Sequence, residues 1–304
     1  MQLEVRAVRK SFGETEVLRG VSFAVESGIA LGLLGKNGAG KTTVMRILME
    51  VFHADSGEIL LDGKKFVPAA HKIGYLPEER GLYPKRTVAE QMVYLARLRG
   101  MKLSQAKESM KKWLKRLEVE EYETRKLETL SKGNQQKVQL AATLVCDPDI
   151  IILDEPFSGL DPVNSQILKA VVNELIAEKK LVIFSSHQMS YVEEFCDQIT
   201  VIDHGSVVLS GRLKDIKKEY GNCRLVLAAE NYSHEQLAKK LEQELGGLVE
   251  VDGRKKEFLI LNIKGTDQSA LLRKLADTDI DVERFGRYEP SLNDIFIAKV
   301  GEEA

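Results

Sequence analysis

One nine-residue stretch constrains the fold more than any other part of the chain. Residues 35–43 read Gly-Lys-Asn-Gly-Ala-Gly-Lys-Thr-Thr, which gives the spacing G-x-x-x-x-G-K-T. The apolar run 29–34 before it predicts a buried strand, and Val44, Ile47 and Leu48 after it are spaced as on one helix face. A glycine-rich turn between a strand and a helix points backbone N–H groups inward, and it therefore predicts a phosphate-binding P-loop.

The side chains of this loop predict how phosphates would be held. Lys41 would reach the β and γ phosphates of a nucleotide, and the Thr42 hydroxyl would ligate Mg²⁺. The residues that we expect around the phosphates are Gly35, Asn37, Gly38, Ala39, Gly40, Lys41, Thr42 and Thr43. The alternative is a chance match in an ordinary glycine turn, against which the motifs further along the chain argue.

Composition narrows the class of protein. With 304 residues, 43% of them hydrophobic and 30% charged, the chain favours two ordinary globular domains. A net charge of −2 gives no overall basic field, so we expect no nucleic-acid partner. The start lacks a signal-peptide core, and no apolar run approaches the ~18–20 residues that span a bilayer. Cys146, Cys196 and Cys223 lack metal-ligand spacing, so we expect reduced thiols in a cytosolic protein.

Two more apolar runs end in residues whose side chains could take part in metal binding or catalysis. The run 150–153 suits a strand of a parallel sheet, and Asp154 and Glu155 follow at its C-terminal end, where such sheets bind ligands. Asp154 would hold Mg²⁺, directly or through water, and Glu155 would polarise an attacking water; the alternative is an acidic pair in a turn. The run 181–186 ends at His187, which would hydrogen-bond a γ-phosphate or a water.

Other segments can be read in two ways. Phe12 lies between the alternating runs 3–8 and 21–25, which predict antiparallel strands; its ring would stack on a base or belong to the core. Residues 88–117 have a helical pattern with interleaved lysines and glutamates, which indicates a solvated face. Ser131 is a natural helix cap; that helix N-terminus would take a phosphate or be only a capped end.

The pattern changes after about Lys218. From residue 224 the expected order is strand, helix, a hairpin around Asp252-Gly253, helix, strand and a tail helix. This βαββαβ order predicts a small ferredoxin-like α+β domain without a catalytic constellation, suited to dimerisation or regulation. The boundaries that we predict are 1–218 for the first domain, about 85–148 for a helical subdomain within it, and 219–304 for the second domain.

With these motifs in this order, the first 218 residues resemble the nucleotide-binding subunit of an ATP-binding cassette (ABC) transporter. The discriminating element is Leu130-Ser131-Lys132-Gly133-Asn134, which is similar to the family's LSGGQ signature. The resemblance implies an α/β P-loop NTPase cassette with a parallel core sheet, an antiparallel β subdomain and a helical signature subdomain. It also implies an ATPase that binds ATP and Mg²⁺ as a head-to-tail homodimer or pseudo-dimer, with each ATP between one P-loop and the partner's signature.

The resemblance assigns roles residue by residue. Residues 35–43 become the Walker A loop and Asp154 with Glu155 the Walker B pair. Phe12 becomes the adenine-stacking aromatic, and Ser131 and Gly133 become the parts of the signature nearest the γ-phosphate. Residues 158–161 become the D-loop, which ends at Asp161. The catalytic residues are then Glu155 and the switch histidine His187, and the Mg²⁺ ligands are Thr42 and Asp154.

Two positions depart from the family pattern. The signature reads Ser-Lys-Gly-Asn rather than Ser-Gly-Gly-Gln, although Ser131 and Gly133 are kept. Glu78 stands at the Q-loop position, where the family usually has Gln. An ionised Glu can ligate Mg²⁺ or accept from water, but it cannot donate, so this change affects the coupling between nucleotide and membrane partner.

The stretch 75–84 and the C-terminal extension resemble cassettes of the exporter class, which includes sodium-efflux and drug- or antibiotic-efflux systems. We therefore expect an ATPase subunit that drives export through a separate integral-membrane permease, bound peripherally at the cytoplasmic face of the membrane. One alternative is a cassette acting on ribosomes or DNA, which would carry two cassettes or a long coiled coil. Another is a regulatory ATP-binding module without turnover, against which the filled positions Glu155 and His187 argue.

Overall fold

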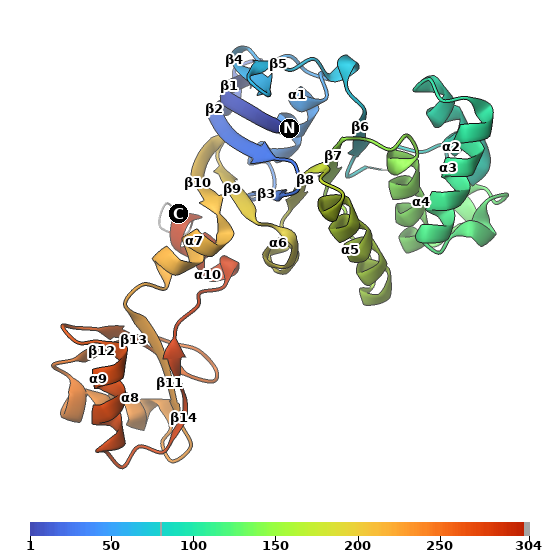
Figure 1. Cartoon of the computed structure of the whole chain (residues 1–304). Helices are drawn as coiled ribbons and strands as arrows, with labels where there is room; N and C mark the ends of the chain where they lie inside the picture. The colour runs from blue at the N-terminus through green and yellow to red at the C-terminus, as the bar shows by residue number, and fades with distance from the viewer. Residues whose placement is uncertain (80, 301–304) are drawn as a thin grey trace. The chain divides into compact units, whose positions relative to one another are not determined.

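The computed structural model describes residues 1–79 and 81–300 and divides them into two compact units (Figure 1). The first is Met1–Leu213 together with Lys299 and Val300, and the second is Lys214–Ala298. In the described part of the chain, no helix is both long enough and apolar enough to cross a bilayer. The boundaries predicted at residue 218 and at about 85 and 148 stay predictions.

The first unit contains a four-stranded antiparallel sheet in the order β2-β1-β4-β5. Its strands are β1 Gln2–Phe12, β2 Thr15–Glu26, β4 Ser56–Leu61 and β5 Lys64–Lys65. β1 and β2 pair with each other and bury Leu3, Val5, Val21 and Val25, because alternate side chains of a strand point to the same face. This confirms the antiparallel pair predicted from the runs 3–8 and 21–25.

A second sheet of six strands has the order β10-β9-β3-β8-β7-β6. Its strands are β3 Ala30–Leu34, β6 Ile73–Leu76, β7 Ile150–Asp154, β8 Leu181–Ser186, β9 Gln198–Asp203 and β10 Ser206–Arg212. All neighbours are parallel except β9 and β10, which form an antiparallel hairpin. Because β3, β7 and β8 run in parallel, the segments that follow them emerge at one edge of the sheet.

Helix α1 (Lys41–Leu48) joins the two sheets. Its Met45 and Leu48 belong to one buried core with Leu3 of β1 and Ile152 of β7, which places α1 between the antiparallel and parallel sheets. Two further helices, α5 Pro162–Ala177 and α6 Met189–Phe195, follow β7 and β8. The α1 core therefore fixes the P-loop against the edge where β7 and β8 end.

Three helices form a group of their own in the first unit. They are α2 Val88–Leu98, α3 Leu103–Arg116 and α4 Lys132–Leu144, which pack on one another beside the six-stranded sheet (Figure 1). The single helical stretch predicted over 88–117 is thus two helices, separated where Gly100 adopts a φ of +87°. Ser131 caps α4 as predicted, because its Oγ accepts from the Asn134 N–H at 3.3 Å.

The second unit has the predicted ferredoxin-like order of elements. They are α7 Leu213–Tyr220, which begins at the boundary, β11 Arg224–Ala229, α8 His234–Leu245, β12 Val249–Arg254, β13 Leu259–Ile263, α9 Gln268–Ala276, β14 Val282–Arg287 and α10 Leu292–Val300. The antiparallel sheet has the order β12-β13-β11-β14. Leu241 of α8 and Leu271 of α9 share a core with Leu225 and Leu261 of the sheet, so both helices cover one face.

The hairpin turn predicted at Asp252-Gly253 is wrong. Both residues lie inside β12, and the turn is formed by residues 255–258, where the first N–H donates to the last carbonyl at 2.9 Å. A register shift before Gly253 marks a β-bulge that absorbs the Asp-Gly pair. The Asp252 carboxylate lies 2.8 Å from Nε of Arg224 on β11, an ion pair that favours the strand conformation over the turn.

Candidate functional site

The P-loop leaves β3 and curls around the ammonium group of Lys41. Lys41 is 7% exposed, and its Nζ donates to the carbonyl oxygens of Gly35 at 2.8 Å and Lys36 at 3.2 Å. Gly35 has a φ of +153°, and a Cβ there would lie 2.2 Å from the Ile202 carbonyl oxygen, so no other residue fits. Among the remaining loop positions, Asn37 and Gly38 are exposed, Ala39 and Gly40 are buried, and Thr42 and Thr43 are half-buried.

Asp154 ends β7 with one oxygen satisfied and one free. Its Oδ1 accepts from Ser185 Oγ of β8 at 2.6 Å, whereas its buried Oδ2 has no hydrogen-bond partner in the described residues. A buried carboxylate oxygen normally needs a donor or a cation. Oxygen ligands are those that Mg²⁺ prefers, so Asp154 and the Thr42 hydroxyl fit this ion. Burial raises the pKa of the neighbouring Tyr75 hydroxyl, and the charge of Asp154 raises it further.

Glu155 is fixed by its backbone and its carboxylate. Its φ is +50°, in the left-handed region, and its N–H donates to Ser185 Oγ at 3.0 Å. Its Oε2 lies 2.9 Å from Nδ1 of His187 and accepts from the His187 N–H at 3.4 Å. The Glu155 side chain is 7% exposed and that of His187 is 50% exposed. The structure thus places Asp154 at the end of β7, Glu155 directly after it, and His187 directly after the neighbouring strand β8.

An aromatic stack holds this pair of segments in place. The Phe157 ring, two residues after Glu155, stacks on Tyr191 with centroids 4.4 Å apart and on Phe195 at 5.4 Å. Tyr191 and Phe195 belong to α6, which begins two residues after His187. The stack therefore ties the loop that carries Glu155 to the helix that follows His187.

The predicted signature lies against the start of α5. A Cβ on Gly133 would lie 2.7 Å from Nδ2 of Asn164, so a larger residue there would require the Asn164 side chain to move. Asp161 caps α5: its Oδ1 accepts from the Asn164 N–H at 2.9 Å, and this hydrogen bond lowers the pKa of Asp161. Lys132, which departs from the family pattern, is exposed, and Asn134 is half-buried. The departures therefore fall at positions that are at least partly exposed, and the kept glycine falls where a Cβ would press on Asn164.

Within one chain, the signature and the P-loop lie in different parts of the first unit. Figure 1 shows α4 in the helical group and α1 on the other side of β6. The structure brings Gly133 close to Asp161 and Asn164 at the start of α5, whereas α4 and the P-loop helix α1 lie apart.

Phe12 and Glu78 lie on exposed segments. Phe12 ends β1, is 43% exposed, and meets Phe52 edge to face with centroids 5.1 Å apart. Lys10 Nζ lies 5.5 Å from the centroid of the Phe12 ring. Glu78 is exposed on the loop after β6. An exposed ring of this kind offers a face on which a base can stack.

Two glutamines that sequence reasoning missed connect α4 to the nucleotide side. Gln139 Nε2 donates to the carbonyl oxygens of Pro77 at 3.4 Å and Glu79 at 3.3 Å, on both sides of Glu78. Gln136 Nε2 donates to the carbonyl oxygen of Pro156 at 3.1 Å. The available signal was a polar residue within the apolar stripe of α4, since Gln139 is only 5% exposed.

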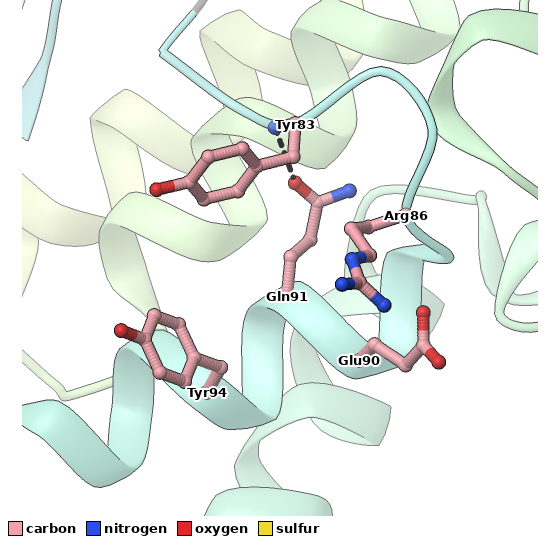
Figure 2. Close-up of a pocket in the computed structure, with 5 residues that line it drawn as sticks. All are labelled: Tyr83, Arg86, Glu90, Gln91 and Tyr94. Carbon is pink, nitrogen blue, oxygen red and sulfur yellow. Dashed lines mark hydrogen bonds between the residues drawn. The ribbon is translucent and has the colours of Figure 1, made fainter.

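A pocket of about 470 Å³ lies at the end of the same loop, lined by Tyr83, Arg86, Glu90, Gln91 and Tyr94. Figure 2 shows both tyrosine rings on one side of Gln91, whose Oε1 accepts from the Tyr83 N–H at 3.0 Å. Tyr83 is 62% exposed and Tyr94 54%, and Leu98, one turn further along α2, is 65% exposed. These three side chains form an exposed apolar stripe beside the pocket.

A loop with P-loop spacing after β3, two carboxylates after β7 and a histidine after β8 place the fold among the P-loop nucleoside triphosphatases. A family model described as ABC transporter matches residues 18–158. A second model, described as the C-terminal domain of DrrA1-3-like ATP-binding proteins, matches residues 211–300.

Individual proteins agree with these models. The ABC transporter ATP-binding protein YhaQ of Bacillus subtilis is 39% identical over 305 residues, covering 98% of both chains. The Nod factor export ATP-binding protein I of Burkholderia lata is 36% identical over 214 residues, covering 69% of this chain and 70% of its own. A solved ATP-binding subunit of an ABC transporter is 28% identical with a TM-score of 0.67, covering 73% of this chain and 94% of its own. The chain therefore belongs to the ATP-binding subunits of ABC transporters, and it is an ATPase of that family.

Proposed function

We propose that this ATPase drives export through a separate integral-membrane permease, as a head-to-tail dimer bound peripherally at the cytoplasmic face of the membrane. The observation that carries the proposal is the buried Glu155 carboxylate, 2.9 Å from His187 and next to Asp154. Glu155 and His187 thus fill both positions needed for hydrolysis, which favours ATP turnover over nucleotide binding without turnover. Export is supported by the relative named for Nod factor export and by the exporter-like stretch 75–84.

The residues divide the work on ATP. Phe12 would stack on the base, Lys41 would hold the β and γ phosphates, and Glu155 would accept a proton from the attacking water. Mg²⁺, held by Thr42 and Asp154, would neutralise phosphate charge. The residues that we propose as phosphate neighbours are Gly35, Asn37, Gly38, Ala39, Gly40, Thr42, Thr43, Glu78 and His187, with Asp161 at the dimer contact.

The dimer follows from the separation of the signature and the P-loop. Ser131 and Gly133 begin α4, and the N-terminus of a helix attracts phosphate. Since α4 and α1 lie on different sides of β6, we propose that Ser131 and Gly133 meet the γ-phosphate bound by a second copy.

We propose that the permease docks at the Tyr83–Tyr94 pocket. The exposed stripe of Tyr83, Tyr94 and Leu98 offers apolar area, and Arg86 and Glu90 offer charges at the other side of Gln91 (Figure 2). Tyr83 of this pocket follows Glu78 by five positions in the chain, and Gln139 of α4 holds the carbonyl oxygens of Pro77 and Glu79 on both sides of Glu78. A movement at the pocket can therefore reach the proposed nucleotide site.

The decisive experiment begins with a neighbouring reading frame that encodes about six apolar spans. Its product, co-expressed with this chain and reconstituted in vesicles, should give ATP-dependent transport and co-purify with the ATPase. Tyr94→Glu should reduce co-purification, whereas Val51→Glu, at a residue that is 60% exposed elsewhere in the first unit, should not. Equal recovery of both variants would remove the pocket from the proposal, and full ATP turnover without any permease association would argue against transport.

A further inference from the structure

The hydroxyl of Ser185 contacts both Walker B residues. Its Oγ donates to Asp154 Oδ1 at 2.6 Å and accepts from the Glu155 N–H at 3.0 Å. Ser185 is 0% exposed on β8, where it pairs in register with Asp154 of β7. Because the one hydroxyl proton goes to Asp154, a lone pair remains for Glu155, and both contacts can exist at once.

We propose that Ser185 is a positioning residue for ATP hydrolysis, which orients the Asp154 carboxylate and holds the backbone of Glu155. This inference rests on the proposed function, because the roles of the two carboxylates toward Mg²⁺ and water come from it. Ser185 is fully buried, so the role that we propose for it is exerted through these two residues.

The first part of the argument concerns Asp154. With Oδ1 engaged by Ser185, the carboxylate cannot rotate without breaking a short hydrogen bond, and Oδ2 is left as the oxygen for a cation or its water. Hydrogen bonds to ligand carboxylates orient them in this way at metal sites. Loss of the Ser185 hydroxyl would free both oxygens and weaken the preference for one orientation.

The second part concerns Glu155. A left-handed φ of +50° is costly for a residue with a Cβ, so the surrounding contacts must hold it. The Glu155 N–H is buried at this point, and Ser185 Oγ is its acceptor at 3.0 Å. This backbone conformation directs the side chain toward His187, so Ser185 acts on the Glu155–His187 contact through the main chain.

Ser186 provides a matched control on the same strand. It is also buried, at 2% exposure, but its Oγ accepts from the Gln188 N–H at 3.0 Å, and it donates to the Gln188 carbonyl oxygen at 3.4 Å; within the residues that the structure describes, it makes no hydrogen bond to Asp154 or Glu155. Ser186→Ala thus removes a buried hydroxyl of the same strand without a direct effect on the carboxylates.

The test uses the full chain and separates positioning from folding. In Ser185→Ala we expect kcat to fall by about 10- to 100-fold, as for other residues that orient metal ligands, and the Mg²⁺ concentration for half-maximal turnover to rise. ATP affinity in EDTA should stay within about twofold, because the P-loop is unchanged. As a readout without turnover, calorimetric titration of ATP in the Glu155→Gln background should show a raised Mg²⁺ requirement when Ser185→Ala is added. Ser186→Ala should leave both quantities within about twofold of their parents.

Ser185→Cys has a side chain of similar size, but its thiol is a poor hydrogen-bond partner, so this variant should show the same losses. If circular dichroism shows that Ser185→Ala is unfolded, the cysteine variant serves as the test instead. Turnover and Mg²⁺ dependence within twofold of the parent in the folded variants would overturn the proposal. In that case a Glu155→Gln chain that has lost turnover would show that the proposed role of Glu155 in ATP hydrolysis stands without Ser185. Full turnover in Glu155→Gln would overturn both.

Discussion

Nδ1 of His187 lies 2.9 Å from Oε2 of Glu155. An ionised carboxylate only accepts hydrogen bonds, so the imidazole donates from Nδ1 in this contact. The half-exposed histidine thus holds the buried carboxylate at the edge of the sheet.

Replacing Glu155 should separate binding from turnover. Glu155→Gln keeps the shape of the side chain but removes the proton acceptor, so turnover should fall by about 10²- to 10⁴-fold while ATP still binds. The variant should also accumulate an ATP-bound dimer, detectable by size-exclusion chromatography with multi-angle light scattering. Turnover at the wild-type rate would show that Glu155 is not the base.

Substitutions of Lys41 and of Ser131 should affect different steps, ATP binding in the first case and dimerisation in the second. Lys41→Ala removes the charge opposite the phosphates, and the loss of a charged hydrogen bond, about 1.5–3 kcal/mol, should weaken ATP binding by roughly 10- to 100-fold. Ser131→Arg should bind ATP normally but not dimerise, because its bulk blocks the phosphate of the opposite copy. Fluorescent-nucleotide titration and sedimentation distinguish the two. Normal hydrolysis by Ser131→Arg would contradict the signature assignment.

Removal of residues 219–304 should leave the nucleotide site intact. We expect the truncated chain to retain its ATP affinity, because Phe12, Lys41 and Asp154 all lie in the unit Met1–Leu213. Dimer stability, permease attachment or regulation should decrease instead. Calorimetric ATP titration and sedimentation with and without MgATP measure these effects. A tenfold weaker affinity in a folded truncation would place the second unit in the nucleotide site.

Asp294 should stabilise the second unit in a pH-dependent way. It pairs with Lys255, and its Oδ2 accepts from Tyr288 OH at 3.1 Å and Ser291 Oγ at 2.7 Å. Burial raises the pKa of Asp294, but the hydrogen bonds from Lys255, Ser291 and Tyr288 outweigh it, so the net pKa is below the usual 3.8. Burial, with the nearby Asp294 charge, raises the pKa of Tyr288 to about 12.

A depressed carboxylate pKa contributes stability above the unfolded-state pKa and loses it as the pH falls through the folded-state value. Asp294→Asn should therefore lower the free energy of unfolding by about 1.5–3 kcal/mol at pH 7, with the difference from wild type shrinking below about pH 4. Denaturant titration at several pH values measures this, with Asp281→Asn, at an exposed carboxylate, as the control. A difference that is constant with pH would contradict the role of the charge.

Local sequence patterns determined most of the elements and the positions of the motifs. Apolar runs such as 150–153 and 181–186 predicted strands because burial on both faces requires apolar side chains throughout. The order of strands and helices after residue 224 predicted the ferredoxin-like unit. Local propensity was insufficient at Asp252-Gly253, where a bulge and the Arg224 ion pair outweigh the turn preference, and at Gly100, which divides the helical stretch.

Only the tertiary structure decided which distant residues meet. Ser185 lies 31 positions from Asp154, and its contact depends on the parallel register of β7 and β8, which no local pattern encodes. The same holds for Glu155 with His187 and for Gln139 with the loop around Glu78. The sequence therefore determined the chemical groups and the strands that carry them, whereas strand pairing and helix packing determined their distances and partners.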